Sequence, residues 1–436
     1  MARSMEQHRS ALRELLARTR PDDAAALLRL DAAAGHILAG DLLAPLALPP
    51  ETNSQMDGFA VCTADLRSPR AGGGAAAAPL ELPVVGISAA GSPPARHECG
   101  AATAVMTGAV LPEGADAVIP VERVHPPRFD TPVITVPAET AAATAPGTFV
   151  REAGSDVARG AVALPAGTVL GPAALGVCAA LGLTGTDTVL VRRGPRVLVV
   201  SGGDEVLPAG APLRPGTVHD ANGPLLRSWF ESAGAESVTH LRVDDDVDAF
   251  TARLRCTVGE DHPDLVVTSG GISAGAFEVV RQALERIAAD VWFGHVAVQP
   301  GGPQGCGTVL GVPVLCLPGN PVSTWVSCES FVRPALAAVW GCCAPPRWVE
   351  ARLGETVTPL DGRTQLRRGI LDTVGGSDLF DGTGRVPRVS LVGGASSHLL
   401  TAAARADVLV RIPPGTDPLP VGTAVAVLPV AGGVVA

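Results

Sequence analysis

The stretch VVTSGGISAGAFE, residues 266–278, joins a short apolar run to the start of a helical pattern. The run Leu265–Val267 predicts a buried strand, because three large apolar residues stand together and two of them are β-branched. Apolar residues then recur at helical spacing: Phe277, Val280, Leu284 and Ile287. The stretch therefore predicts a strand, a Gly/Ser turn and a helix, in that order.

The turn at Ser269-Gly270-Gly271 has the composition of an anion-binding turn. Paired glycines adopt positive φ and let backbone N–H groups approach a ligand. A turn before a helix N-terminus also carries unpaired N–H donors and the positive end of the helix dipole. Ser273 adds a hydroxyl group and Glu278 a carboxylate. We expect the turn to bind an anion; the alternative is a strand–helix turn without a chemical role.

A further interpretation of the same stretch is the nucleophile elbow of a hydrolase. Residues 271–275 match the pattern G-x-S-x-G after a strand, with Ser273 as the nucleophile. Such a hydrolase needs an acid and then a histidine downstream. Asp290 and His295 have that order but lie only a few residues apart, and no HGGG-type oxyanion loop precedes them. The elbow is therefore the weakest of the three interpretations.

Composition excludes several classes of protein. The 436 residues are enough for two to four domains. All 33 basic residues are arginine, because the sequence contains no lysine. The chain can therefore form neither the Schiff base of a pyridoxal phosphate enzyme nor the P-loop of an NTPase.

The net charge and the cysteine usage limit the binding partners and the cellular compartment that we expect for this protein. A formal charge of −10 disfavours nucleic-acid binding, which needs a basic surface. The nine cysteines form no C-x-x-C pair, so we expect reduced thiols in a cytoplasmic protein. We expect no membrane partner, because no apolar run in the sequence is long enough to span a bilayer.

The order of patterns along the chain predicts four regions. Residues 5–17 have the spacing of an amphipathic helix, and Pro21 and Gly35 are typical of the start and end of a second one. Another helix is expected at Ala173–Leu181. The predicted regions are a helical domain (1–50 with 150–180), a small β domain (51–149), an α/β domain (181–342) and a C-terminal β domain (343–436).

Strand and helix patterns alternate in the third region. The predicted strands are Val197–Val200, Leu265–Val267 and Val314–Leu317, and the predicted helices lie near Pro224–Ala233, Val247–Val258, Phe277–Ala288 and Val322–Val339. This alternation implies a doubly wound α/β fold, with a parallel sheet and helices on both faces. Ligands of such sheets bind at the carboxyl ends of the strands. Polar turns stand at those ends: Ser201–Glu205, Thr268–Gly271 and Pro318–Ser323.

Acidic residues accompany these turns. Glu205 and Glu278 follow two of the strands, and Asp220 stands just before a helix. Carboxylates around a phosphate-binding turn favour a divalent cation that bridges them to an anion. Asp57, in an Asp-Gly turn before an apolar strand, is a further candidate. Each of these acids can instead cap a helix or stabilise a turn, and both interpretations stay open.

The collected motifs resemble one known family over nearly the whole chain. The matching segments are Met56–Ala60, Thr107-Gly108 with Leu111–Asp116, Arg151 with Gly154 and Asp156, Ser201–Glu205, Asp220 with Asn222, Thr268–Gly275, Pro318–Ser323 and Ser396-Ser397-His398. In this order and spacing they resemble the molybdopterin molybdenumtransferases, the molybdenum insertases that include the gephyrin E domain.

The resemblance implies an elongated protein of four parts: a helical linker domain, a small β domain, a molybdopterin-binding doubly wound α/β domain and a C-terminal β domain. It also implies a homodimer with a cleft shared between subunits. The implied reaction belongs to molybdenum cofactor biosynthesis. The phosphoanhydride of adenylylated molybdopterin is cleaved, molybdate is inserted at the dithiolene and AMP is released, with Mg²⁺ as cofactor.

The resemblance also assigns roles to individual positions. The catalytic acids are Asp57, Glu205, Asp220 and Glu278, and the expected metal ligands are Asp220 and Glu278. The expected substrate-binding residues are Thr107, Gly108, Gly202, Gly203, Asn222, Ser269, Gly270, Gly271, Ser273, Pro300, Gly301, Gly319, Asn320 and Pro321. The expected molybdate contacts are Ser323, Arg367 and Ser396.

Two positions depart from the family pattern in a way that bears on function. Gln299 and Gly302 stand where the family has lysines that help to hold molybdate. Losing two cations removes on the order of several kcal/mol of attraction for a dianion. Two alternatives to molybdate insertion therefore stay open: another reaction on a phosphate- or nucleotide-bearing substrate, and a non-enzymatic scaffold.

Overall fold

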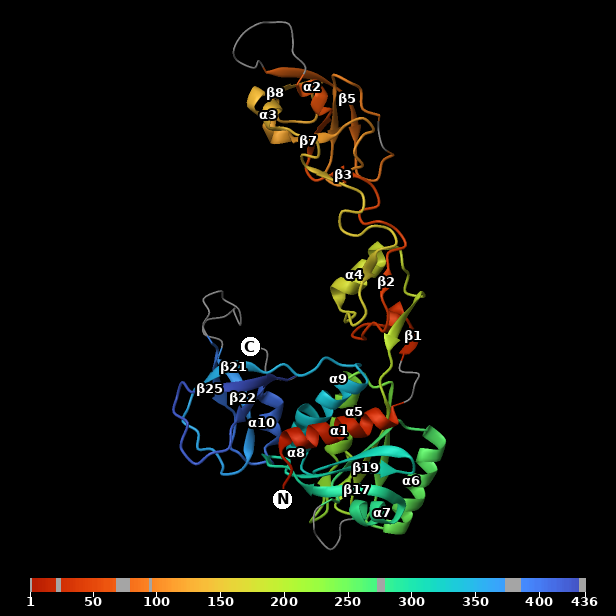
Figure 1. Cartoon of the computed structure of the whole chain (residues 1–436), viewed down its shortest axis with the longest axis vertical. Helices are drawn as coiled ribbons and strands as arrows, with labels where there is room; N and C mark the ends of the chain where they lie inside the picture. The colour runs from red at the N-terminus through yellow and green to blue at the C-terminus, as the bar shows by residue number, and fades with distance from the viewer. Residues whose placement is uncertain are drawn as a thin grey trace. The chain divides into compact units, whose positions relative to one another are not determined.

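The computed structural model describes residues 2–20, 25–67, 79–93, 96–272, 279–372 and 386–430. They form two compact units (Figure 1). The first unit consists of Met1–Leu28, Gly35–Ala39 and Leu190–Ala436, and the second of Arg29–Ala34 and Gly40–Val189. Every helix among the described residues is too short or too polar to cross a membrane.

A six-stranded sheet forms the centre of the first unit. Its order is β15 (Ser237–Val243), β12 (Arg196–Gly202), β16 (Leu265–Ser269), β20 (Val312–Leu317), β19 (Pro303–Val309) and β17 (Ala288–His295). The first four strands are parallel, as the alternation of strand and helix predicted. A two-stranded pair beside them joins β13 (Val206–Leu207) to β14 (Val218–His219).

The antiparallel edge of this sheet departs from the predicted pattern. Strands β17 and β19 both run antiparallel to their neighbours. The link between β19 and β20 is the two-residue turn Leu310-Gly311, in which both residues have positive φ. Positive φ at both central residues is typical of a tight hairpin, which reverses the chain without a crossover helix.

Helices cover both faces of the sheet (Figure 1). Val197 and Val199 of β12 face α1 (Met5–Thr19), α5 (Asn222–Ser232), α8 (Pro321–Ser327) and α9 (Arg333–Val339), with a π-helical turn at Cys328–Val332. Leu198 and Val200 face α6 (Val247–Asp261) and α7 (Val279–Ile287). Because side chains alternate along a strand, one strand supplies both apolar cores, which confirms the doubly wound α/β arrangement.

The first helix, α1, belongs to this α/β core, whereas the sequence assigned it to a helical domain. Ser4 caps its N-terminus with a capping box to Gln7. Leu12 and Leu16 are fully buried in the core that also contains Leu336 of α9. The amphipathic face was therefore predicted well, but the surface that buries it lies about 300 residues away in sequence.

The second helix predicted between Pro21 and Gly35 is wrong for the described part of that range. Ala25–Arg29 form strand β1, in a two-stranded sheet, and Leu30–Ala32 form a 3₁₀ turn. Leu27 is 69% exposed, so the segment has no buried helical face. Strand pairing here overrides the helical propensity of an Ala/Leu sequence. Pro21 itself lies outside the described residues.

A β domain ends the first unit. The order of its strands is β18 (Val298–Gln299), β22 (Thr364–Asp372), β23 (Arg388–Leu391), β21 (Val349–Leu353), β25 (Ala424–Pro429) and β24 (Val408–Ile412). Because β22 also pairs with β24, the sheet closes on itself into a small barrel. Helix α10 (Leu400–Arg405) packs against β22 and α8, which joins the barrel to the α/β core.

The second unit contains a five-stranded sheet. Its order is β7 (Ala117–Pro120), β4 (Gly58–Val61), β6 (Ala102–Val105), β5 (Leu80–Ser88) and β8 (Val133–Val136). Shorter elements are β2 (Leu42–Leu43), β3 (Asn53–Ser54), β9 (Val150–Arg151), β10 (Val162–Leu164), α2 (Thr63–Leu66), α3 (Ala138–Ala143) and α4 (Pro172–Ala180). The helix predicted at Ala173–Leu181 corresponds to α4 and is confirmed within one residue.

Candidate functional site

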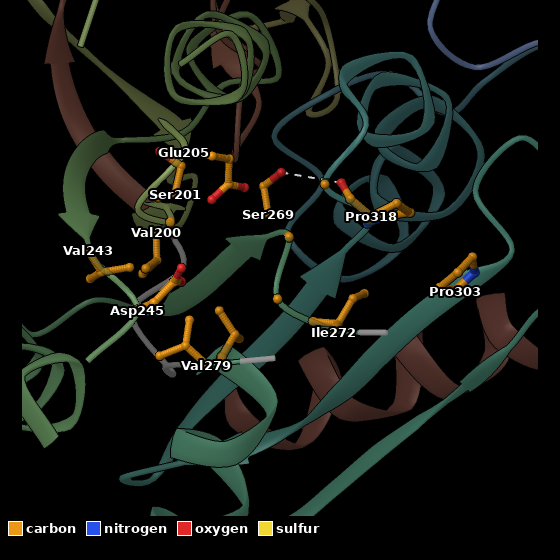
Figure 2. Close-up of a pocket in the computed structure, with 16 residues that line it drawn as sticks. Val200, Ser201, Glu205, Val243, Asp245, Ser269, Ile272, Val279, Pro303 and Pro318 are labelled. Carbon is orange, nitrogen blue, oxygen red and sulfur yellow. Dashed lines mark hydrogen bonds between the residues drawn. The ribbon is translucent and has the colours of Figure 1, made fainter. Parts of the chain in front are cut away.

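A cavity of about 500 Å³ lies at the carboxyl ends of the central strands of the first unit (Figure 2). The residues that line it are Val200, Ser201, Gly202, Gly203, Glu205, Val243, Asp245, Ser269, Gly270, Gly271, Ile272, Val279, Val280, Pro303, Pro318 and Gly319. The three polar turns predicted from the sequence thus meet at one cavity, where ligands of doubly wound sheets bind. Ser273 and Glu278 lie outside the described residues.

Glycine shapes the turn that follows β12. Gly202 and Gly203 have φ values of +152° and +130°, which side chains rarely adopt. A Cβ on Gly202 would collide with the carbonyl oxygen of Val243, and one on Gly203 with the carboxylate of Glu205. Position 202 therefore requires glycine, because fixed backbone blocks a Cβ there. Position 203 favours glycine through its φ value, since the exposed Glu205 side chain can move aside.

Gly202→Ala is expected to lower the free energy of unfolding of the first unit by about 3 kcal/mol, because the new Cβ meets backbone atoms that cannot rotate away. Urea unfolding followed by tryptophan fluorescence reports on this unit, since all five tryptophans lie in it. Gly210→Ala is the matched control, because Gly210 also has positive φ but open space around it. Equal losses in the two variants would show that the collision is not the cause.

The turn after β16 packs against the loop after β20. The N–H of Gly270 donates to the carbonyl of Leu317 at 3.0 Å, and the Ser269 hydroxyl donates to the carbonyl of Pro318 at 3.3 Å (Figure 2). A Cβ on Gly319 would lie 3.2 Å from the Cα of Gly270. Asn320 then caps α8, with Pro321 at its first turn. These contacts hold two predicted substrate-binding turns side by side.

Two carboxylates stand at the cavity wall, and the sequence singled out only one of them. Glu205 follows β12 and Asp245 follows β15 (Figure 2). Asp245 accepts a hydrogen bond from the N–H of Asp204 at 3.2 Å, and Asp204 accepts one from the N–H of Asp245 at 3.3 Å. The acidic run directly after a parallel strand was the signal that could have identified Asp245.

Asp220 lies behind the cavity wall instead of on it. Its Oδ2 accepts the hydroxyl hydrogen of Ser201 at 2.7 Å, and its Oδ1 accepts the N–H of Gly223 at 2.9 Å. The ring of His240 touches the same hydroxyl at 2.7 Å. Burial lowers the pKa of His240. The charge of Asp220 opposes that shift, whereas the charges of Arg227 and Arg242 add to it. Asn222 donates to the carbonyl of Gly319 at 2.7 Å, so the start of α5 is tied to the cavity.

Asp57 and Thr107 come together in the second unit. The N–H and the hydroxyl of Thr107 donate to Oδ1 of Asp57 at 2.7 and 2.8 Å, and these bonds lower the pKa of that exposed carboxyl. Gly108 follows with a φ of +80°. A Cβ on Gly58 would collide with the carbonyl of Ile119, so the Asp-Gly turn is fixed against the sheet.

Two of the predicted molybdate contacts lie on regular elements, Ser323 on α8 and Arg367 on β22. Gln299 pairs with Gln365 of β22, and Gly301 accepts a hydrogen bond from Gln304 at 2.8 Å. A Cβ on Gly301 would lie 3.4 Å from the carbonyl oxygen of the buried Ser323. Pro300 and Gly301, which were predicted to bind the substrate, are both buried. Ser396 is exposed, and its hydroxyl lies 2.6 Å from Nδ1 of His398.

Arg368 is a residue that the sequence analysis did not assign to the site. Its side chain is buried. Among the described residues no carboxylate forms an ion pair with this side chain, and its Nε has no hydrogen-bond partner. Its guanidinium donates to the carbonyl of Gly394. The neighbouring Arg367 is half-buried, and burial lowers the pKa of both side chains. A buried arginine without an ion-pair partner among the described residues favours an anion, and strand alternation was the signal that Arg368 faces inward.

A metal centre formed by protein side chains alone is not visible in the described part of the chain. No three His, Cys, Asp or Glu side chains there are grouped closely enough to hold an ion. Both oxygens of Asp220, one of the two expected metal ligands, already accept hydrogen bonds from the protein.

Comparisons with known proteins cover most of the chain. Residues 3–182 match the MoeA N-terminal region (domain I and II), residues 198–338 a probable molybdopterin binding domain, and residues 350–430 the MoeA C-terminal region (domain IV).

Similar proteins agree with these matches. Molybdopterin molybdenumtransferase 2 of Mycobacterium tuberculosis H37Rv is 38% identical over 97% of this chain and 98% of its own length. The molybdopterin molybdenumtransferase of Haemophilus influenzae is 30% identical over 88% of each chain. A crystal structure of the molybdopterin biosynthesis MoeA protein from Pyrococcus horikoshii has a TM-score of 0.72, with 27% identity, and covers 98% of this chain and 99% of that one. Full-length relatives at this identity show that the chain belongs to the molybdopterin molybdenumtransferase family, which confirms the expected transferase and lends no support to a repurposed enzyme or a scaffold.

Proposed function

We propose that this protein inserts molybdate at the dithiolene of molybdopterin, cleaving adenylylated molybdopterin and releasing AMP. The observation that carries the proposal is the cavity at the carboxyl ends of β12, β16 and β20, which three glycine-containing turns surround. A phosphate group fits such turns because their glycines leave no Cβ to block its approach to the backbone.

The proposal assigns different roles to the glycine-containing turns and to the acidic residues. Gly202, Gly203 and the Ser269–Gly271 turn hold the phosphates through backbone contacts. Glu205, at the cavity wall, orients the oxygen nucleophile that attacks phosphorus and accepts its proton. Asp57, held by Thr107 in the second unit, stays a proposed catalytic residue.

The proposed Mg²⁺ fits a site that the substrate completes. Mg²⁺ is usually bound by one or two carboxylates together with substrate phosphates and water. Glu205 and Asp245 supply two carboxylates at the cavity wall and would hold the ion there. Bound Mg²⁺ would neutralise charge on the phosphates. Asp220 serves better as a structural acid, because the fold already uses both of its oxygens. Glu278 stays a proposed ligand outside the described residues.

The assembly and the compartment also stay proposals. We propose a cytoplasmic homodimer, as the family resemblance implies. All nine cysteines lie within the described residues and are free thiols, which supports a reducing compartment. Light scattering on the purified protein tests the dimer, and a monomer at micromolar concentration would contradict it.

Release of AMP tests the reaction itself. Purified protein is supplied with adenylylated molybdopterin, molybdate and Mg²⁺, and both AMP and active cofactor are measured. We expect both products in equal amounts. Failure to release AMP with any divalent cation would refute the proposed reaction.

Restoring the family's lysines is expected to strengthen molybdate binding. In Gln299→Lys with Gly302→Lys, two added cations attract the dianion, and we expect molybdate affinity to rise about tenfold or more. The second substitution is sterically mild, since a Cβ at position 302 would lie 3.4 Å from its nearest backbone atom. Isothermal titration with molybdate measures the change, and Gln299→Met is the uncharged control. Tight binding by the native protein, unchanged in the double variant, would contradict the prediction.

A further inference from the structure

Three polar side chains from three different segments form one hydrogen-bonded chain beneath the cavity. Ser201 lies next to the last residue of β12, His240 lies on the neighbouring strand β15, and Asp220 precedes α5. The Ser201 hydroxyl oxygen lies 2.7 Å from Oδ2 of Asp220 and 2.7 Å from Nε2 of His240. The side chains of Asp220 and His240 are only 5% and 18% exposed, so water competes little for these bonds.

The chemistry of the three groups fixes the direction of the chain. An ionised carboxylate only accepts hydrogen bonds, so the single hydroxyl hydrogen of Ser201 points to Asp220. The hydroxyl oxygen must then accept from the ring, which requires that His240 carries its hydrogen on Nε2. The order is therefore His240 to Ser201 to Asp220, and the imidazole is the donor that sets the hydroxyl rotamer.

The absence of a side chain at Gly223 allows the close approach of Asp220 and His240. A Cβ on Gly223 would lie 2.7 Å from Oδ2 of Asp220 and 2.8 Å from Nε2 of His240. Such distances are too short for any side chain, so glycine at this position lets the ring and the carboxylate approach each other. The N–H of Gly223 also donates to Oδ1 of Asp220 at 2.9 Å. The carboxylate is thus held on one oxygen by backbone and on the other by the Ser201–His240 pair.

We propose that His240 is a positioning residue for the proposed reaction: acting through Ser201, it fixes the carboxylate of Asp220 and the start of α5. This inference rests on the proposed function. Ser201 itself lines the cavity, and Asn222, two residues after Asp220, holds the carbonyl of Gly319 at the cavity wall. Loss of the imidazole donor frees the hydroxyl to rotate, which loosens both contacts without removing a group that touches the substrate.

The matched pair His240→Leu and His240→Gln tests the role of the donor. In His240→Leu we expect the kcat of AMP release to fall about tenfold, with KM for adenylylated molybdopterin changed less than about twofold. Glutamine places an amide N–H where the Nε2–H of the imidazole stood, so His240→Gln is expected to recover most of the rate. Val238→Ala, on the same face of β15, controls for general loosening of this strand.

A readout without substrate separates this inference from the proposed function. Nitrogen-15 NMR of the ring is expected to show the Nε2–H tautomer of His240 in wild-type protein, and a change in that signal in Ser201→Ala. An Nδ1–H tautomer would overturn the inference even if AMP is released. So would a folded His240→Leu variant at the wild-type rate, or a folded His240→Gln variant as slow as His240→Leu. Wild-type protein that shows the Nε2–H tautomer but releases no AMP would refute the proposed function and with it the catalytic part of the inference.

Discussion

Glu205→Gln is expected to lower the rate of AMP release by about 100-fold or more, with little change in the stability of the first unit. Glu205 is exposed and lies at the cavity wall, on a turn whose backbone is set by Gly202 and Gly203. The amide keeps the shape of the side chain but cannot accept a proton from the nucleophile or hold a cation. Steady-state AMP release at saturating molybdate and Mg²⁺ measures the effect.

A control substitution in the first unit separates the effect of removing any exposed carboxylate from the effect of removing the one at the cavity wall. Glu231→Gln removes one exposed carboxylate from α5, away from the residues that line the cavity. That variant is expected to keep the wild-type rate. If Glu205→Gln retains more than about a tenth of wild-type activity, Glu205 is not the general base that we propose.

The second large effect concerns stability in acid. His8 of α1 is buried against Phe331 and Trp292, with ring centroids at 5.0 and 5.7 Å. Neither ring nitrogen has a hydrogen bond of good geometry among the described residues, although the amide of Gln304 lies close enough to act on the ring. Burial, and next the charge of Arg3, lower the pKa of His8 to about 4, and the amide of Gln304 offsets part of that shift.

The sign of the effect follows from the two pKa values. The unfolded chain takes up a proton at His8 near pH 6.5, whereas the folded protein takes it up only near pH 4. The stability contributed by the neutral imidazole is therefore complete above pH 6.5 and is lost as the pH falls toward 4. The loss from this one group amounts to about 2 kcal/mol at pH 5 and roughly 3 kcal/mol below pH 4.

Urea unfolding of wild type and His8→Phe at pH 8 and pH 5 isolates this contribution. We expect the free energy of unfolding to fall between the two pH values by about 2 kcal/mol more in wild type than in His8→Phe. His219→Phe, at an exposed position, serves as the control and is expected to keep the wild-type difference. Identical pH dependence in wild type and His8→Phe would contradict the prediction.

Sequence patterns predicted best those elements whose pattern lies within one short segment of the chain. The β-branched runs of β12, β16 and β20 mark buried parallel strands, and the glycine turns after them meet at one cavity, as predicted. The antiparallel strands β17 and β19 were not predicted, since periodicity alone does not show which way a strand runs.

Residues whose role depends on distant neighbours were the ones missed. His240 stands in an ordinary strand pattern, and only the fold brings it to Ser201 and Asp220. Arg368 differs from Arg367 only in the face of β22 from which it projects. The roles assigned to single residues stay proposals.

The position of α1 has a consequence for the order in which the protein is made. The helix leaves the ribosome well before α9, which shares its core and follows roughly 300 residues later, a delay of about 15 to 60 s at ordinary synthesis rates. The second unit, by contrast, ends at Val189 and is complete well before then. During that interval the apolar stripe of the nascent N-terminal helix has no native partner, so it is the segment that a chaperone would be expected to shield.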